Sequence, residues 1–123
     1  GKKQFCVSTQ HYSFAVNAFV DLIKKYGQEE YDFSLRETQT YEIIEDVAKM
    51  RSEIGILFLN DFNEKVITKI LKSNELEFHD LFVGNHFYYF DRGSSYLASF
   101  PMSWNFTTFL WQSPMYLSVA DIL

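Results

Sequence analysis

The order of hydrophobic and polar positions predicts alternating strands and helices over the first two thirds of the chain. Apolar residues spaced by three and four mark amphipathic helices, whereas alternating or short continuous apolar runs mark strands. Strands are predicted at residues 4–8, 31–36, 54–59 and 76–83, and helices at residues 11–26, at 41–51 and after an Asp61 cap through Leu71. This order, with short crossovers, indicates an α/β fold in which helices flank a mostly parallel sheet.

The C-terminal part has a less regular pattern. Aromatic residues make up 19% of the chain, and many of them follow Val83. Gly84 and Gly93 favour turns, and Pro101 and Pro114 limit helix length. Residues 87–90, FYYF, have the composition of a strand, while residues 117–123 leave strand, turn and helix start open. We expect this part to be irregular and rich in aromatic residues.

Polar residues follow each of the first three predicted strands. The carboxyl ends of parallel strands meet at one edge of a sheet, where ligands bind near helix N-termini. Helix capping is the alternative explanation, but capping needs one such residue per helix and two of these turns carry three. Hydroxyls, amides and free helix N–H groups favour a small carboxylate, sulfate or similar anion. The predicted ligand contacts are Ser8, Thr9, Gln10, Thr38, Gln39, Thr40 and Asn60.

Glu37 complicates an anion site at this edge, because its carboxylate would repel the ligand. The sequence leaves three alternatives: Glu37 faces an amine, or it pairs with Arg36, or it pairs with Arg51. Glu37 with His11 is also the one visible titratable pair that an enzyme at this edge would have.

Composition excludes several classes of function. The net charge of −5 argues against direct nucleic-acid contact, which needs a basic face. A hydrophobic fraction of 47% and a charged fraction of 22% are typical of a globular domain. The apolar runs fall short of the roughly 18 to 20 residues that span a bilayer, so no membrane contact is expected. Cys6 has no second cysteine to pair with, which favours an intracellular location.

Motifs for catalysis, metals and cofactors are not recognised in the sequence. There is no Gly-x-Ser-x-Gly elbow, and Cys6 has no neighbouring histidine to activate it. His11, His79 and His86 lack the paired spacing of metal sites on a helix. The first strand-to-helix turn has no glycine to cradle a phosphate. We therefore expect no catalytic residues, no metal and no cofactor.

The first part of the chain resembles the effector-binding domain of LysR-type transcriptional regulators. The resemblance rests on FCVSTQHYSFAVNAFVDLIKKYGQEEYDFSLRETQTYEIIEDVAKMRSEIGILFL, in which Glu53-Ile54-Gly55-Ile56 is similar to the family's Asp-Leu-Ala-Ile type run. LEFHDLF, residues 76–82, resembles the stretch that leads to the second lobe. The family domain has the two-lobed fold of type 2 periplasmic binding proteins. The resemblance implies that residues 1–83 form the first lobe, and that residues 84–123 are a divergent or truncated continuation that packs on the lobe or swaps with it.

The resemblance also implies a function. It predicts a cytoplasmic, non-enzymatic domain that senses a small-molecule effector and regulates transcription, with DNA bound by an N-terminal winged-helix module outside this sequence. A homodimer or higher oligomer is expected through residues 15–26 and 31–35. The alternatives are a solute-binding protein or small α/β enzyme of the same fold, and an interaction fragment without a ligand.

Overall fold

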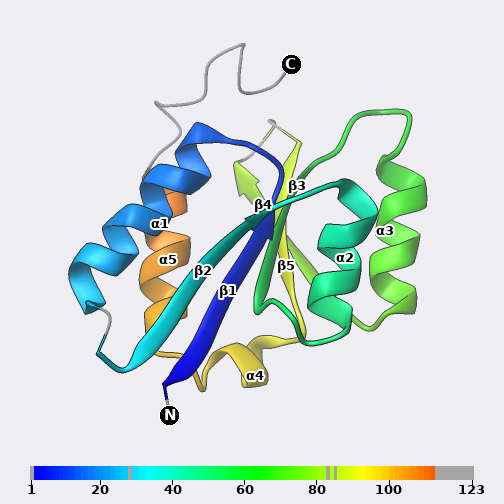
Figure 1. Ribbon diagram of the computed structural model, residues 1–123. Helices are drawn as coiled ribbons and strands as arrows, with labels where there is room; N and C mark the ends of the chain where they lie inside the picture. Colours follow the sequence, from blue (N-terminus) through cyan, green and yellow to red (C-terminus); the bar gives the residue numbers. More distant parts are fainter. Residues whose placement is uncertain (1, 28, 83, 85, 113–123) are drawn as a thin grey trace.

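A five-stranded sheet forms the centre of the molecule, with helices on both of its faces (Figure 1). The computed structural model describes residues 2–27, 29–82, 84 and 86–112. The strands are β1 (Lys3–Thr9), β2 (Tyr31–Glu37), β3 (Ile54–Phe58), β4 (Glu77–Phe82) and β5 (Phe87–Asp91). The helices are α1 (Ser13–Tyr26), α2 (Thr40–Ala48), α3 (Glu64–Ser73), α4 (Ser94–Leu97) and α5 (Met102–Trp111). The predicted α/β class, a sheet flanked by helices, is confirmed.

The sheet is mixed rather than mostly parallel. Its strand order is β2-β1-β3-β5-β4, and β1 pairs in parallel with both β2 and β3. β5 lies between β3 and β4 and is antiparallel to both. The physical reason is the short connection from β4 to β5, residues 83–86, because a parallel crossover needs about a dozen residues or more. β4 therefore runs in the same direction as β1, β2 and β3, and β5 runs against them.

The C-terminal part is more regular than the sequence predicts. The strand expected at residues 87–90 is confirmed as β5, and two helices follow it. Pro101 occupies the N-cap position of α5, where a missing N–H costs nothing, so this proline precedes a helix instead of breaking one. α5 packs beside α1 and buries Phe106 and Leu110 against the sheet. Pro114 and residues 117–123 lie outside the described residues.

The two helical layers cover different parts of the core. The face under α1 and α5 is rich in phenylalanine, and the face under α2 and α3 is mainly aliphatic. Gly55 in β3 is needed on the second face, because a Cβ atom there would lie 2.3 Å from the Phe90 ring. Cys6 is buried in β1, as expected of a structural cysteine.

Some predicted boundaries differ from the structure. α3 begins at Glu64 with Asn63 in the N-cap position, so the prediction that Asp61 caps this helix is wrong. The reason is a tight turn closed by asparagine side chains, in which Asn60 Oδ1 accepts hydrogen bonds from the N–H groups of Phe62 (2.9 Å) and Asn63 (3.0 Å). Within the described parts of the chain, no helix combines the length and apolar content required to span a membrane.

Candidate functional site

The polar turns predicted to bind a ligand follow the carboxyl ends of β1, β2 and β3, so all three lie at the same edge of the sheet. We call this region the polar rim and define it as residues 8–11, 37–42 and 60–64. The backbone N–H of Thr38 donates a hydrogen bond to the carbonyl of Thr9 (2.9 Å). The side-chain amide of Gln10 donates to Thr40 Oγ1 (3.0 Å). The first and second turns are therefore in direct contact, although Gln10 and Thr40 are far apart in the sequence.

Tyr12 fixes the orientation of the Gln10 side chain. Its hydroxyl donates to Gln10 Oε1 (2.8 Å) and accepts a hydrogen bond from the N–H of Phe58 (3.2 Å). Burial raises the pKa of Tyr12 to about 12, and the Phe58 N–H offsets part of this rise. The hydroxyl therefore stays protonated at neutral pH and acts as a donor, which directs the Gln10 nitrogen toward Thr40.

An open hollow of about 420 Å³ lies at this contact and is lined by Gln10, Gln39, Thr40, Tyr41 and Glu42. Three of these five residues are predicted ligand contacts. Tyr41 is exposed, so its ring is accessible to a bound molecule. The hollow thus combines two amides, a hydroxyl, an aromatic ring and a carboxylate.

The helix-capping alternative does not explain the polar triplets. The N-cap positions of α1 and α2 are Tyr12 and Gln39, and neither side chain makes a capping hydrogen bond. The Thr38 hydroxyl donates instead to the Glu42 carboxylate. A helix without a side-chain cap leaves its first N–H groups to water or to a ligand.

Ser8 and Thr9 are less accessible than the other predicted contacts. Both are fully buried. The Ser8 hydroxyl donates to Asp46 Oδ2 (2.8 Å) and lies 2.6 Å from the Ser52 hydroxyl, so it faces α2 and not the hollow. Thr9 Oγ1 has no hydrogen-bond partner within the described part of the chain. Ligand contact by these two residues stays a prediction.

Glu37 pairs with His11, a contact that the sequence analysis considered only as the titratable pair of an enzyme. His11 Nδ1 lies 3.1 Å from Glu37 Oε2. The two arginines proposed as partners contact Asp46 instead, at 3.3 Å for Arg36 Nε and 2.9 Å for Arg51 Nε. When His11 is protonated it balances the Glu37 charge, which reduces the repulsion of an anion at the rim.

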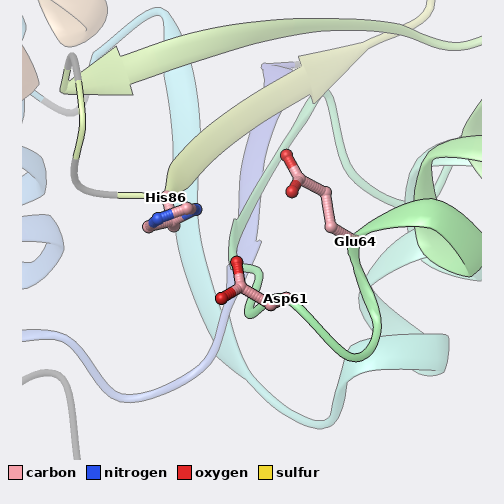
Figure 2. Close-up of side chains that lie close together, drawn as sticks. All are labelled: Asp61, Glu64 and His86. Carbon is pink, nitrogen blue, oxygen red and sulfur yellow. The ribbon is translucent and has the colours of Figure 1, made fainter.

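A group of potential metal ligands lies beside Asn60 at the third turn (Figure 2). One ligand atom from each of Asp61, Glu64 and His86 lies within 4.8 Å of the others. Figure 2 shows Asp61 on the loop after β3, Glu64 at the start of α3 and His86 just before β5. Asp61 does not cap α3, and Figure 2 shows its carboxylate on the side of the loop that faces His86.

The environment of Glu64 is shaped by β5. The Tyr88 hydroxyl donates to Glu64 Oε1 (2.6 Å), and this hydrogen bond is the main reason that the pKa of Tyr88 rises to about 12. The sequence did not indicate this group, because His86 reaches Asp61 only when β5 inserts next to β3. A pattern search along the chain has no signal for an insertion of this kind.

The chain was compared with protein-family models, with curated proteins and with solved structures, and none of them matches it. The LysR resemblance therefore stays a prediction.

Proposed function

We propose that this chain is the effector-sensing lobe of a LysR-type transcription regulator and binds a small metabolite at the polar rim. The observation that carries the proposal is the hydrogen bond from Gln10 to Thr40 at the edge of the hollow. It joins the turn after β1 to the turn after β2. A sheet with these two turns at opposite ends would have offered no shared site.

The chemistry of the hollow favours a small ligand that carries both an acidic group and an amine or amide. The first turn of α2 has no side-chain cap, so its N–H groups are suited to a carboxylate. Glu42 lies in the same hollow and can accept a hydrogen bond from an amine, and the exposed ring of Tyr41 can contact a cation. When His11 is protonated, its pairing with Glu37 reduces the repulsion toward an acidic ligand.

The buried hydroxyl of Thr9 supports ligand or water entry behind the first turn. A buried polar group without a partner costs about 1–3 kcal/mol. Thr9 Oγ1 is such a group within the described part of the chain, and the Thr9 carbonyl already joins the two turns. A molecule that reaches this hydroxyl would recover part of the cost.

Regulation requires that ligand binding favours one of two states. We propose that these states differ in the pairing of two copies through α1 and β2. β2 is an edge strand of the sheet, with its outer backbone edge available for contacts, and Val20 on α1 is 41% exposed. Light scattering at micromolar concentration should give the mass of a dimer or a higher oligomer. A monomeric mass with and without ligand would contradict this part of the proposal.

The effector site can be tested by thermal shift with a set of amino acids, organic acids and amines. Thr40→Val removes the hydroxyl that accepts the Gln10 bond while keeping the shape of the side chain. A ligand that stabilises the wild type should stabilise Thr40→Val much less, with a loss of affinity of about tenfold for one hydrogen bond of about 1–1.5 kcal/mol.

Thr68→Val is the matched control, because Thr68 lies on α3 and its hydroxyl bonds to the Glu64 carbonyl (2.8 Å), away from the hollow. Its ligand response should equal that of the wild type. Equal responses of Thr40→Val and the wild type would reject the rim as the binding site.

A small α/β enzyme is the second candidate, and the contact of His11 with Glu37 is the observation that favours it. A histidine paired with a carboxylate can act as a general base. Both side chains are largely exposed, at 77% and 44%, which is more typical of a surface ion pair. If any turnover is found, His11→Gln should abolish it, and unchanged turnover in this variant would exclude the pair from catalysis.

A further inference from the structure

Three side chains with metal-binding atoms share one face of the β4–β5 strand pair. Glu77 and His79 are two positions apart on β4, so both project to the same side of the sheet. Asp91 is directly opposite Glu77 in the antiparallel register, and cross-strand partners also share a face. One ligand atom from each of the three lies within 4.8 Å of the others. Strand register alone thus brings two carboxylates and an imidazole together.

Neighbouring groups hold these side chains in position. The N–H of Gly93 donates to Asp91 Oδ1 (2.7 Å), and the Ser94 hydroxyl donates to Glu77 Oε2 (3.1 Å). The second oxygen of Asp91, Oδ2, lies 3.3 Å from His79 Nε2. Hydrogen bonds such as those from Gly93 and Ser94, which come from residues that do not bind the ion, orient metal ligands in known sites. They leave the other oxygen of each carboxylate available.

The histidine ring is fixed by its cross-strand neighbour. His79 stacks on Tyr89, with 4.7 Å between ring centroids and an interplanar angle of 25°. Tyr89 is the register partner of His79, so the same strand pairing that aligns Glu77 with Asp91 also orients the imidazole. The three potential ligands are therefore on rigid elements and not on a loop.

The charges at this position favour a cation. Like charges directly opposite each other destabilise a strand pair. Asp91 is 1% exposed, and it lies directly opposite Glu77 in the strand register. A divalent cation between the carboxylates would turn this repulsion into attraction.

A cavity of about 220 Å³ adjoins two of the three side chains, His79 and Asp91. Both His79 and Asp91 face it, and the rest of its wall comes mainly from α4, α5 and the segment between them. The cavity has room for water or a small ligand beside a bound ion. Trp104, which is 75% exposed, forms part of its lining.

We propose that Glu77, His79 and Asp91 bind a divalent transition-metal ion, with Zn²⁺ as the best match. An imidazole nitrogen suits Zn²⁺ better than Mg²⁺ or Ca²⁺, which prefer oxygen ligands alone. Three protein ligands leave a fourth position open, and the cavity supplies it with water or a small ligand. Because β4 runs parallel to β3, its first residues lie at the opposite edge of the sheet from the polar rim, so this site is independent of the proposed effector site.

The test is calorimetric titration of the chelator-treated protein with ZnCl₂. His79→Gln removes one ligand at a side chain that is 36% exposed, so the fold should tolerate the change. His86→Gln is the matched control, because it removes the histidine of the Asp61–Glu64–His86 group at the other edge. The wild type and His86→Gln should each bind about one equivalent of Zn²⁺. His79→Gln should lose about 100-fold in affinity, because loss of a residue that only supports a metal ligand already costs about 10- to 100-fold.

Three results would overturn the proposal: no binding by the wild type, equal binding by all three proteins, or loss of binding in His86→Gln alone. Co²⁺ gives a second readout of position. Bound Co²⁺ should quench the fluorescence of Trp104, and the quenching should be largely absent in Trp104→Phe. Quenching that persists unchanged in Trp104→Phe would place the ion elsewhere and reject the assignment.

Discussion

The two faces of the central sheet are packed with different kinds of side chain. Under α1 and α5, phenylalanine rings contact one another; for example, the Phe87 ring centroid lies 5.1 Å from those of Tyr12, Phe14 and Phe58. Under α2 and α3 the core is aliphatic, with Phe90 the one aromatic ring among its buried members in the described part of the chain. Both faces contain buried polar groups: Ser8, Asp46 and Ser52 contact one another on the second face, and Asp91 and Ser103 line a cavity beside α5 on the first.

The difference follows from where the residues lie in the sequence. The aliphatic face draws mainly on residues 43–76, which are close along the chain, whereas the aromatic face joins residues 5–22 to residues 81–110. Large rings make more contacts per residue and prefer tilted or edge-on geometries. The aromatic face is therefore the part of the core that fastens the C-terminal segment to the first strand and helix.

The largest expected effect comes from Phe87→Ala on the aromatic face. Removing a fully buried phenylalanine costs about 3–5 kcal/mol, and lost ring contacts add about 0.5–1.5 kcal/mol each. Leu71→Ala is the counterpart on the aliphatic face, where a buried leucine costs about 2–5 kcal/mol. Denaturant unfolding followed by circular dichroism measures both. We expect the loss to be greater for Phe87→Ala, and a greater loss for Leu71→Ala would contradict this expectation.

Sequence patterns were sufficient for the half of the molecule in which neighbours in space follow one another in the chain. The alternation of residues 31–36 and the helical spacing of residues 11–26 arise from burial of one side, and each structure is visible within a single short segment. The position of β5 was not predictable in this way. β5 follows β4 in the chain but inserts between β3 and β4 in the sheet. The spacing of apolar residues within one segment contains no information about which strands will be its neighbours.

The candidate sites also differ in how far the sequence could predict them. The polar rim follows from parallel strand order, so Gln10, Gln39 and Thr40 could be named in advance. His79 and His86 were dismissed because their spacing along the chain is irregular. Their carboxylate neighbours come partly from other elements, brought close by antiparallel pairing or by the turn after β3. Spacing rules for metal sites on a single helix have no information about such pairs.

A smaller effect is expected from Asp46→Ala, which removes a buried carboxylate that contacts Ser8 on the aliphatic face. Asp46 is 1% exposed, and its carboxylate accepts from the Ser8 hydroxyl and contacts Arg36 and Arg51. The substitution leaves Ser8 without this acceptor, while the arginines, which are 47% and 46% exposed, can be hydrated. We expect a loss of about 1–3 kcal/mol by denaturant unfolding.

Glu45→Ala on the same helix is the control for Asp46→Ala, because Glu45 is an exposed neighbour with its own lysine and arginine contacts. It should change stability little. A loss as large as that of Asp46→Ala would mean that helix α2, and not the buried carboxylate, is sensitive to substitution.

The smallest effect concerns the pH dependence contributed by Glu53, a 7% exposed residue just before β3. Burial raises its pKa above the ordinary value of 4.5, although the N–H of Cys6, which donates to Glu53 Oε2 (2.8 Å), and Arg92 oppose the rise. A carboxyl with a raised pKa in the folded state stabilises the fold below pH 4.5, and this stabilisation is lost as the pH rises through the folded-state pKa. Glu53→Gln keeps an acceptor for the Cys6 N–H but cannot ionise, so its melting temperature relative to the wild type should be higher at pH 7 than at pH 4. The difference in melting temperature between Glu53→Gln and the wild type could instead stay constant between pH 4 and pH 7, or fall as the pH rises. Either result would show that ionisation of the buried Glu53 carboxyl does not destabilise the fold.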